Sequence, residues 1–91
     1  MLELSSKDRA ALRGVAQRLK PAAQVGKNGV SEGLVKELIF AFKSEDLIKV
    51  AFKAERDEIP ALVSKIEEET GSICVGGVGK KRAFYRPIDA E

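Results

Sequence analysis

The chain has 91 residues, of which 44% are hydrophobic and 33% are charged, and its formal net charge is +2 at pH 7. This composition is typical of a folded globular protein rather than a disordered one. The sequence contains no histidine and a single cysteine, Cys74. It therefore excludes a histidine-based triad, a histidine metal ligand and an internal disulfide.

A chain of this length can bury one core, so we expect one domain over residues 1–91, with its core over about residues 5–87. No run approaches the ~18 apolar residues that cross a bilayer. The first five residues lack the basic and apolar segments of a signal peptide. We expect a cytoplasmic monomer without a membrane partner, in which Cys74 is a small buried residue of an apolar run.

Charged residues are unevenly distributed along the chain. Residues 1–30 contain six basic residues and two acids, whereas residues 31–70 contain six basic residues and ten acids. Residues 71–88 contain four basic residues and no acid, and the acids Asp89 and Glu91 follow them. Basic ends on either side of an acidic middle favour contact of one face with a polyanion, rather than a uniformly mixed surface.

The first expected element is a helix capped by Ser5 or Ser6. Apolar residues at i, i+3, i+4 and i+7 predict its buried stripe: Leu12, Val15, Ala16 and Leu19. Pro21 disfavours helical geometry in the residue before it, so the helix is expected to end at Leu19 or Lys20.

A glycine-framed loop comes before the second helix. Residues 21–25 read as a short strand, and Ser31 is expected to cap the helix that follows. Two glycines between them bracket a lysine and an asparagine, and we call these four residues the GxxG loop: Gly26, Lys27, Asn28 and Gly29. Glycine permits close backbone approach, and a helix start offers unpaired N–H groups. Such a loop suits a phosphate, although the same residues also make an ordinary tight turn with a surface lysine.

The second helix is expected to end near residues 44–46 and is followed by the clearest strand, over residues 47–53. The helix has a dense apolar face: Leu34, Val35, Leu38, Ile39 and Phe42. One face of the strand holds three apolar residues: Ile48, Val50 and Phe52. Lys49 and Lys53 alternate on its other face, with Ala51 between them.

A third helix is expected to begin near residues 56–58, with Pro60 in its first turn and Gly71 at its end. Its buried stripe has helical spacing: Ile59, Leu62, Val63 and Ile66. The run Glu67, Glu68 and Glu69 is expected to be a solvated acidic edge, and a cation site is the alternative.

A hairpin closes the chain. Residues 73–75 start its first strand and residues 83–85 lie in its second. In the link between them, Gly76 and Gly79 are expected to serve a turn or bulge, with lysines at the tip. The order α-β-α-β-α-β-β predicts an α/β sandwich with a four-stranded mixed sheet.

The sequence carries no recognisable set of catalytic residues. It lacks Walker-type spacing, a GxGxxG after a strand and zinc-binding cysteine pairs, and Cys74 has no histidine partner. We therefore expect a binding module without cofactor or metal, not an enzyme.

Five segments, in this order, resemble a known family: Leu19-Lys20-Pro21, Val25-Gly26-Lys27-Asn28-Gly29-Val30-Ser31-Glu32-Gly33, Leu47-Ile48-Lys49-Val50, Glu69-Thr70-Gly71 and Phe84-Tyr85-Arg86-Pro87. With them the chain closely resembles the bacterial YhbY-type ribosome-associated proteins, which are stand-alone members of the CRM (chloroplast RNA splicing and ribosome maturation) domain family. The resemblance implies the fold above, similar to the C-terminal domain of bacterial translation initiation factor three. It also implies RNA binding, association with precursors of the large ribosomal subunit and a role in ribosome assembly.

The family likeness implies that the GxxG loop is the RNA loop, because in that family it is likened to the RNA-contacting loop of KH domains. Two further groups of basic residues extend the expected RNA surface: Arg9, Arg13 and Lys20 along the first helix, and Lys80, Lys81, Arg82 and Arg86 in the final hairpin. The hairpin is more glycine-rich and more basic than is usual in the family. Only five aromatic residues are present, so we expect recognition of RNA shape and backbone rather than base stacking.

The leading hypothesis is thus an RNA-binding protein that acts on ribosomal RNA during maturation of the large subunit. The alternative is a protein-interaction adaptor that docks a basic ribosomal protein through the acidic third helix.

Overall fold

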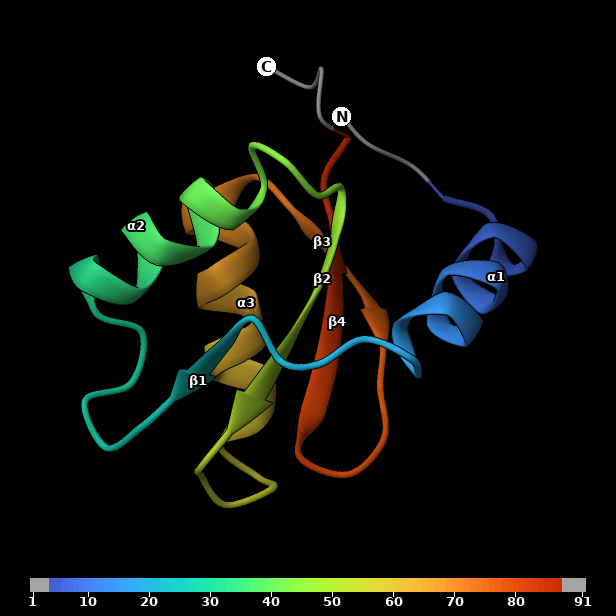
Figure 1. Cartoon of the computed structure of the whole chain (residues 1–91). Coiled ribbons are helices and arrows are strands. Elements are labelled where there is room, and N and C mark those ends of the chain that lie inside the picture. Colours follow the sequence, from blue (N-terminus) through green and yellow to red (C-terminus); the bar gives the residue numbers. More distant parts are fainter. Residues whose placement is uncertain (1–3, 88–91) are drawn as a thin grey trace.

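The computed structural model describes residues 4–87, which fold in the expected order α-β-α-β-α-β-β (Figure 1). The helices are α1 (Ser6–Ala16), α2 (Glu32–Ala41) and α3 (Ile59–Thr70). The strands are β1 (Ala23–Val25), β2 (Leu47–Phe52), β3 (Ile73–Gly76) and β4 (Lys81–Tyr85). The charged residues Glu3, Asp89 and Glu91 lie outside the described residues.

The strands form one sheet in the order β1-β2-β4-β3, which confirms the predicted four-stranded mixed sheet. β1 and β2 are parallel, with Val25 opposite Phe52, and α2 makes the crossover between them. β4 runs antiparallel to both of its neighbours. The two edges of the sheet are therefore β1 and β3.

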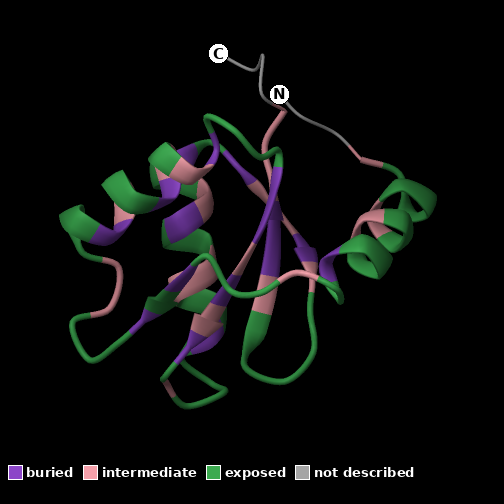
Figure 2. Ribbon diagram, viewed as in Figure 1, coloured by how far each residue is buried: buried purple, intermediate pink, exposed green. Residues whose placement is uncertain are grey.

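The larger core lies between the sheet and helices α2 and α3, which pack on one face (Figures 1 and 2). The period of two in β2 places three alternate side chains in this core, as predicted: Ile48, Val50 and Phe52. Two further groups contribute to it: Leu34 and Leu38 of α2 with Phe42 directly after that helix, and Ile59 and Ile66 of α3. Phe84 of β4 is 0% exposed at its centre. Both predicted helix stripes therefore face this core, with Val35 and Ile39 only half-buried.

A smaller core lies on the opposite face, under α1. It contains four buried residues: Ala16, Leu47, Val75 and Ala83. Leu12 and Leu19 of the predicted stripe are partly buried against this cluster. Val15 is 55% exposed, so its predicted burial is wrong. One residue of the helix turns by about 100°, so Val15 is directed well away from the buried Ala16, and α1 touches the sheet along a narrow line.

Two helices end earlier than the sequence suggests. α1 ends at Ala16, and the N–H of Leu19 then donates to the Ala16 carbonyl oxygen at 3.0 Å in a tighter turn. α2 ends at Ala41, and the N–H of Lys43 donates to the Phe40 carbonyl oxygen at 3.1 Å in the same manner. Helical periodicity continues through such turns, which is why periodicity alone overextends both helices.

The predicted caps are confirmed. The Ser5 hydroxyl accepts the Asp8 N–H at 3.1 Å, and the Ser31 hydroxyl accepts the Leu34 N–H at 3.2 Å. Gly71 ends α3 at φ +70°. In the described residues, no helix has the length and apolar character needed to cross a membrane.

Candidate nucleic-acid interface

The GxxG loop forms a hydrogen-bonded turn with three exposed residues, Gly26, Lys27 and Asn28. The Gly29 N–H donates to the Gly26 carbonyl oxygen at 3.0 Å, and Gly29 has φ +66°, which favours glycine. A Cβ placed on Gly26 would meet nothing within 4 Å. The turn therefore requires glycine at position 29, whereas at position 26 the fold leaves the backbone open to approach.

Part of the N–H capacity near the start of α2 is already used within the fold. The Ser31 hydroxyl already accepts the Leu34 N–H, and the Gly29 N–H is used within the turn. Glu32 follows directly, and its carboxylate lies 3.4 Å from the Lys36 ammonium on the exposed helix surface. Lys27 is thus the main positive group that the loop itself presents.

Backbone hydrogen bonds bring the GxxG loop and the basic hairpin to the same end of the sheet, which we call the loop end. The Lys53 N–H donates to the Val25 carbonyl oxygen at 2.9 Å, just before the GxxG loop. On the other side of β2, the Phe52 N–H donates to the Lys80 carbonyl oxygen at 2.8 Å. Two stretches that are distant in the sequence are therefore both anchored to the last residues of β2.

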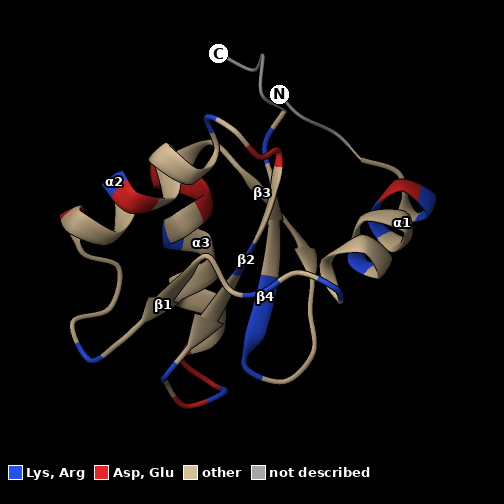
Figure 3. Ribbon diagram, viewed as in Figure 1, with Lys and Arg blue, Asp and Glu red and all other residues tan. Residues whose placement is uncertain are grey.

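The loop end is not uniformly basic. The connection from β2 to α3, residues 53–58, lies between the GxxG loop and the hairpin and carries both signs of charge (Figure 3). Its acids are Glu55, Asp57 and Glu58, all exposed. A polyanion that follows the very tip of the loop end would meet these carboxylates, so the two basic contacts flank an acidic loop.

Arg9 and Arg13 use their guanidinium groups within the fold. Nη1 of Arg9 donates to the Cys74 carbonyl oxygen and Nη1 of Arg13 to that of Val75, each at 3.1 Å. They bind the edge strand β3 at a bulge, where Cys74 and Gly76 oppose the consecutive residues Phe84 and Ala83. A Cβ on Gly76 would lie 2.6 Å from the Arg13 side chain. Each guanidinium has five donors, so the remaining ones can still reach a phosphate.

The other basic residues expected to bind RNA are distributed over two ends of the sheet. Lys80 and Lys81 are exposed at the hairpin. The Arg82 side chain instead folds back, and its Nη1 donates to the Lys81 carbonyl oxygen at 2.9 Å. The Arg86 N–H donates to the Asp46 carbonyl oxygen at 2.8 Å, beside the first residue of β2. Arg86 therefore lies at the end of β4 opposite to Lys81, and the structure does not bring it together with the hairpin lysines.

The sheet face beside α1 is only partly covered, and its uncovered part carries no acid. We call this part the open face: Gln24, Lys49, Ala51 and Lys81. Gln24 is opposite Ala51, and Ala51 is opposite Lys81, so these side chains cross three strands side by side. Lys20 directly follows Leu19, whose carbonyl oxygen accepts from the Lys49 ammonium at 3.4 Å.

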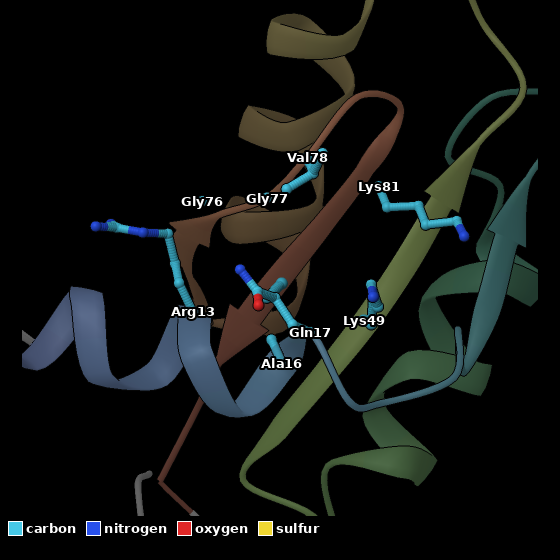
Figure 4. A pocket seen from close by; sticks show the side chains of 9 residues that line it. Arg13, Ala16, Gln17, Lys49, Gly76, Gly77, Val78 and Lys81 are labelled. Atoms are coloured by element: carbon cyan, nitrogen blue, oxygen red, sulfur yellow. The ribbon is translucent and has the colours of Figure 1, made fainter.

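A cleft of about 190 Å³ lies between the open face, α1 and the hairpin (Figure 4). Its lining consists of Arg13, Ala16, Gln17, Lys49, Gly76, Gly77, Val78, Lys81 and Ala83. A shallower cleft adjoins it and is lined by Gln17, Lys49, Ala51, Phe52, Val78, Lys80 and Lys81. Figure 4 shows the Arg13 guanidinium turned away from the space between Gln17, Lys49 and Lys81. None of the lining residues is Asp or Glu.

Sequence analysis did not single out Lys49 and Gln17, which line both clefts of the candidate interface. Lys49 belongs to the acidic middle of the chain, and only its place on the outer face of β2 takes it away from those acids. The alternation of Lys49 and Lys53 on one face of the strand was the available signal. Gln17 follows the end of α1 and had no signal in sequence.

The acidic end of α3 is partly structural. Oε2 of Glu67 accepts the Cys74 N–H at 2.7 Å, so this residue is half-buried rather than solvated as predicted. The Glu69 carboxylate lies 3.2 Å from the Lys65 ammonium. Burial, and secondarily the nearby Glu67 carboxylate, raise the pKa of the half-buried Cys74 thiol. Within residues 4–87, no cluster of three or more His, Cys, Asp or Glu residues is placed to bind a metal ion.

The model of one protein family, the CRS1/YhbY (CRM) domain, matches residues 4–86. A Haemophilus influenzae protein named "RNA-binding protein" is 34% identical over 98% of this chain and 91% of its own length. A Pseudomonas aeruginosa protein named "Probable RNA-binding protein PA4753" is 33% identical over 93% of this chain and 83% of its own length.

The fold is also similar to a solved structure. The solution structure of the hypothetical protein SAV1595 from Staphylococcus aureus superimposes with a TM-score of 0.84 at 28% identity. The likeness covers 98% of this chain and 92% of that one.

Proposed function

Because this chain belongs to the CRS1/YhbY (CRM) domain family, we propose that it binds RNA through its GxxG loop and its open face. The observation that carries the proposal is an acid-free route across the sheet. The route begins at Lys81 and Lys49, passes Ala51 and Gln24, and reaches the GxxG loop two residues after Gln24. It avoids the acidic 53–58 connection at the tip of the loop end. Ammonium groups at both ends of such an acid-free route suit the repeating negative charge of a sugar–phosphate backbone.

We further propose that the RNA is a precursor of the large ribosomal subunit and that the protein assists its assembly in the bacterial cytoplasm. The likeness to YhbY-type ribosome-associated proteins supports this proposal, whereas the names of the relatives support RNA binding in general. The contacts on this surface are lysines and exposed backbone, with no aromatic platform on the open face. Such contacts fit recognition of RNA shape and backbone by a binding protein, not chemistry on the RNA.

The alternative, an adaptor that docks a basic ribosomal protein through α3, has less support. Glu67 is engaged with β3 and Glu69 with Lys65, which leaves Glu68 as the exposed acid of this run without such a contact in the described residues. Capture of partners from cells with and without nuclease treatment separates the two functions. Partners of an RNA-binding protein are lost after nuclease, whereas partners docked on α3 persist.

Salt-dependent RNA binding tests the proposed surface. Replacing Lys27, Lys80 and Lys81 by alanine removes three charges, so the slope of log K against log salt is expected to fall by about 2–3. Lys43→Ala is a matched control, because Lys43 lies in the connection that precedes β2, at the opposite end of the sheet. An unchanged slope in the triple variant would overturn the site, and in-cell crosslinking should recover precursor RNA of the large subunit.

A further inference from the structure

The cleft between α1 and the hairpin has a chemistry that backbone binding does not use. Its lining includes two buried alanines, Ala16 and Ala83, and the backbone of Gly76 and Gly77. Its rim carries the ammonium groups of Lys49 and Lys81 and the amide of Gln17. Phosphate binding uses the cations of the rim, but it does not use the apolar surface between them.

Val78 of the hairpin adds apolar surface at the mouth of this cleft. Its side chain is 73% exposed, and it lines both adjoining clefts. A Cβ on the neighbouring Gly77 would lie 2.0 Å from the Lys81 carbonyl oxygen, so the hairpin backbone is closely packed at this point. The fold therefore presents Val78 at the mouth of the cleft without burying it.

We propose that this cleft receives one unpaired nucleotide of the bound RNA, and this inference rests on the function proposed above. The base lies on the apolar floor beside Val78, and the Gln17 amide, which both donates and accepts, hydrogen-bonds its edge. The flanking phosphates lie against Lys49 and Lys81. Figure 4 shows Gln17 placed between the hairpin and Lys49, where a base entering the cleft would pass.

The size and depth of the cleft favour this occupant over two others. Sites for separate small molecules are typically enclosed and have about 300–1,000 Å³. This cleft has only 190 Å³, and the adjoining cleft of about 430 Å³ is shallow and open to solvent. A uniform A-form duplex presents phosphates and a shallow minor groove, so it would contact the rim and leave the floor empty. Bulges and loops supply bases that are splayed out of the helix.

The test compares two RNAs of the same charge, a hairpin with a one-nucleotide bulge and a fully paired hairpin, with the full-length protein. The wild type is expected to bind the bulged RNA about fivefold more tightly, which corresponds to one net hydrogen bond. Gln17→Ala and Val78→Ser, neither of which changes the charge, are each expected to reduce this preference while keeping the salt slope. Ser64→Ala is the control, because Ser64 is exposed on α3, on the opposite side of the sheet, and lines neither cleft.

The outcomes separate this inference from the function on which it rests. Equal binding of the two RNAs by the wild type overturns the nucleotide site, as does a preference that both cleft variants retain. In either case, the proposed function would still hold if RNA binding weakens with salt and requires Lys27, Lys80 and Lys81. If neither RNA binds at low salt, both proposals fall. A preference lost in Gln17→Ala but kept in Ser64→Ala supports the site.

Discussion

The two faces of the sheet differ in how they are covered. The face toward α2 and α3 contributes to a core of eleven buried residues, whereas the face toward α1 contributes to one of four. On the first face, every β2 side chain is apolar: Ile48, Val50 and Phe52. On the second face, Leu47 is followed by Lys49 and Ala51. One face therefore holds the fold together, and the other supports α1 at one end and remains open at the other.

This difference shows how a small domain combines stability with a wide binding surface. Burial of apolar area supplies most of the favourable free energy of folding, and one well-filled layer can supply it. The second layer is then free to carry lysines, which would be costly to bury. Its helix is fastened by polar contacts at the sheet edge, from Arg9 and Arg13 to β3.

The largest expected effect compares neighbouring residues of β4 that face opposite ways. Phe84→Ala should lower the free energy of unfolding by about 3–5 kcal/mol, because it leaves a cavity in the larger core. Tyr85 is half-buried against the smaller cluster, so Tyr85→Ala should cost about half as much. Urea unfolding measures both values. Equal losses would show that the two faces contribute alike to stability.

A second effect concerns the polar attachment of α1. Arg9→Met removes the hydrogen bond to the Cys74 carbonyl and should cost about 1–2 kcal/mol. Arg18→Met is the matched control, because Arg18 is exposed in the turn after α1. Amide hydrogen exchange in β3 should accelerate in the first variant only. If both variants behave alike, the smaller core alone holds α1 on the sheet.

A third effect separates the two glycines of the GxxG loop. Gly29→Ala places a side chain at φ +66° and should cost about 1–2 kcal/mol. Gly26→Ala should leave stability within about 0.5 kcal/mol, because its Cβ meets no atom, yet it should weaken RNA binding. Thermal unfolding and RNA titration of both variants measure this. RNA affinity unchanged in Gly26→Ala would remove close backbone approach from the proposed contact.

The smallest effect is the pH dependence that Cys74 contributes. Burial raises the pKa of this thiol above its ordinary value of 9.0, so the unfolded chain loses its proton first as the pH increases. The contribution to stability is therefore complete below about pH 9 and is lost as the pH rises through the higher pKa of the folded state. Between pH 8 and pH 10, the wild type should lose more stability than Cys74→Ala in urea unfolding. If both proteins lose the same stability over this range, the Cys74 thiol is exposed to solvent in the folded state.

Much of the fold could be predicted from the sequence, because local signals determine it. A period of about 3.6 placed the three helices and a period of two placed β2, whereas short apolar runs next to glycines placed the other strands. The cap residues Ser31 and Gly71 act within one turn of the chain. The errors fell where periodicity outlasts the element, at the ends of α1 and α2. The burial predicted for Val15 was also wrong, because the apolar character of a residue does not show how narrow the contact between α1 and the sheet is.

The candidate site was less predictable. The GxxG loop and the basic hairpin stood out in the sequence because each is a continuous segment with its own composition. Their common position at the loop end follows from hydrogen bonds of Phe52 and Lys53 to opposite neighbours of β2. The pairing of β2 with β1 and β4 also places the acidic connection between the GxxG loop and the hairpin and forms the cleft beside Gln17 and Lys49. No single segment of the sequence predicts either feature.

The sequence by itself determined the order of the elements, the larger core and the family to which the chain belongs. Only the tertiary structure decided which basic residues share a surface. It separated Arg86 from Lys81, engaged Arg9 and Arg13 with β3, and moved Lys49 from an acidic stretch of chain onto an acid-free face. The physical reason is that charge acts through space, whereas a sequence records only distance along the chain.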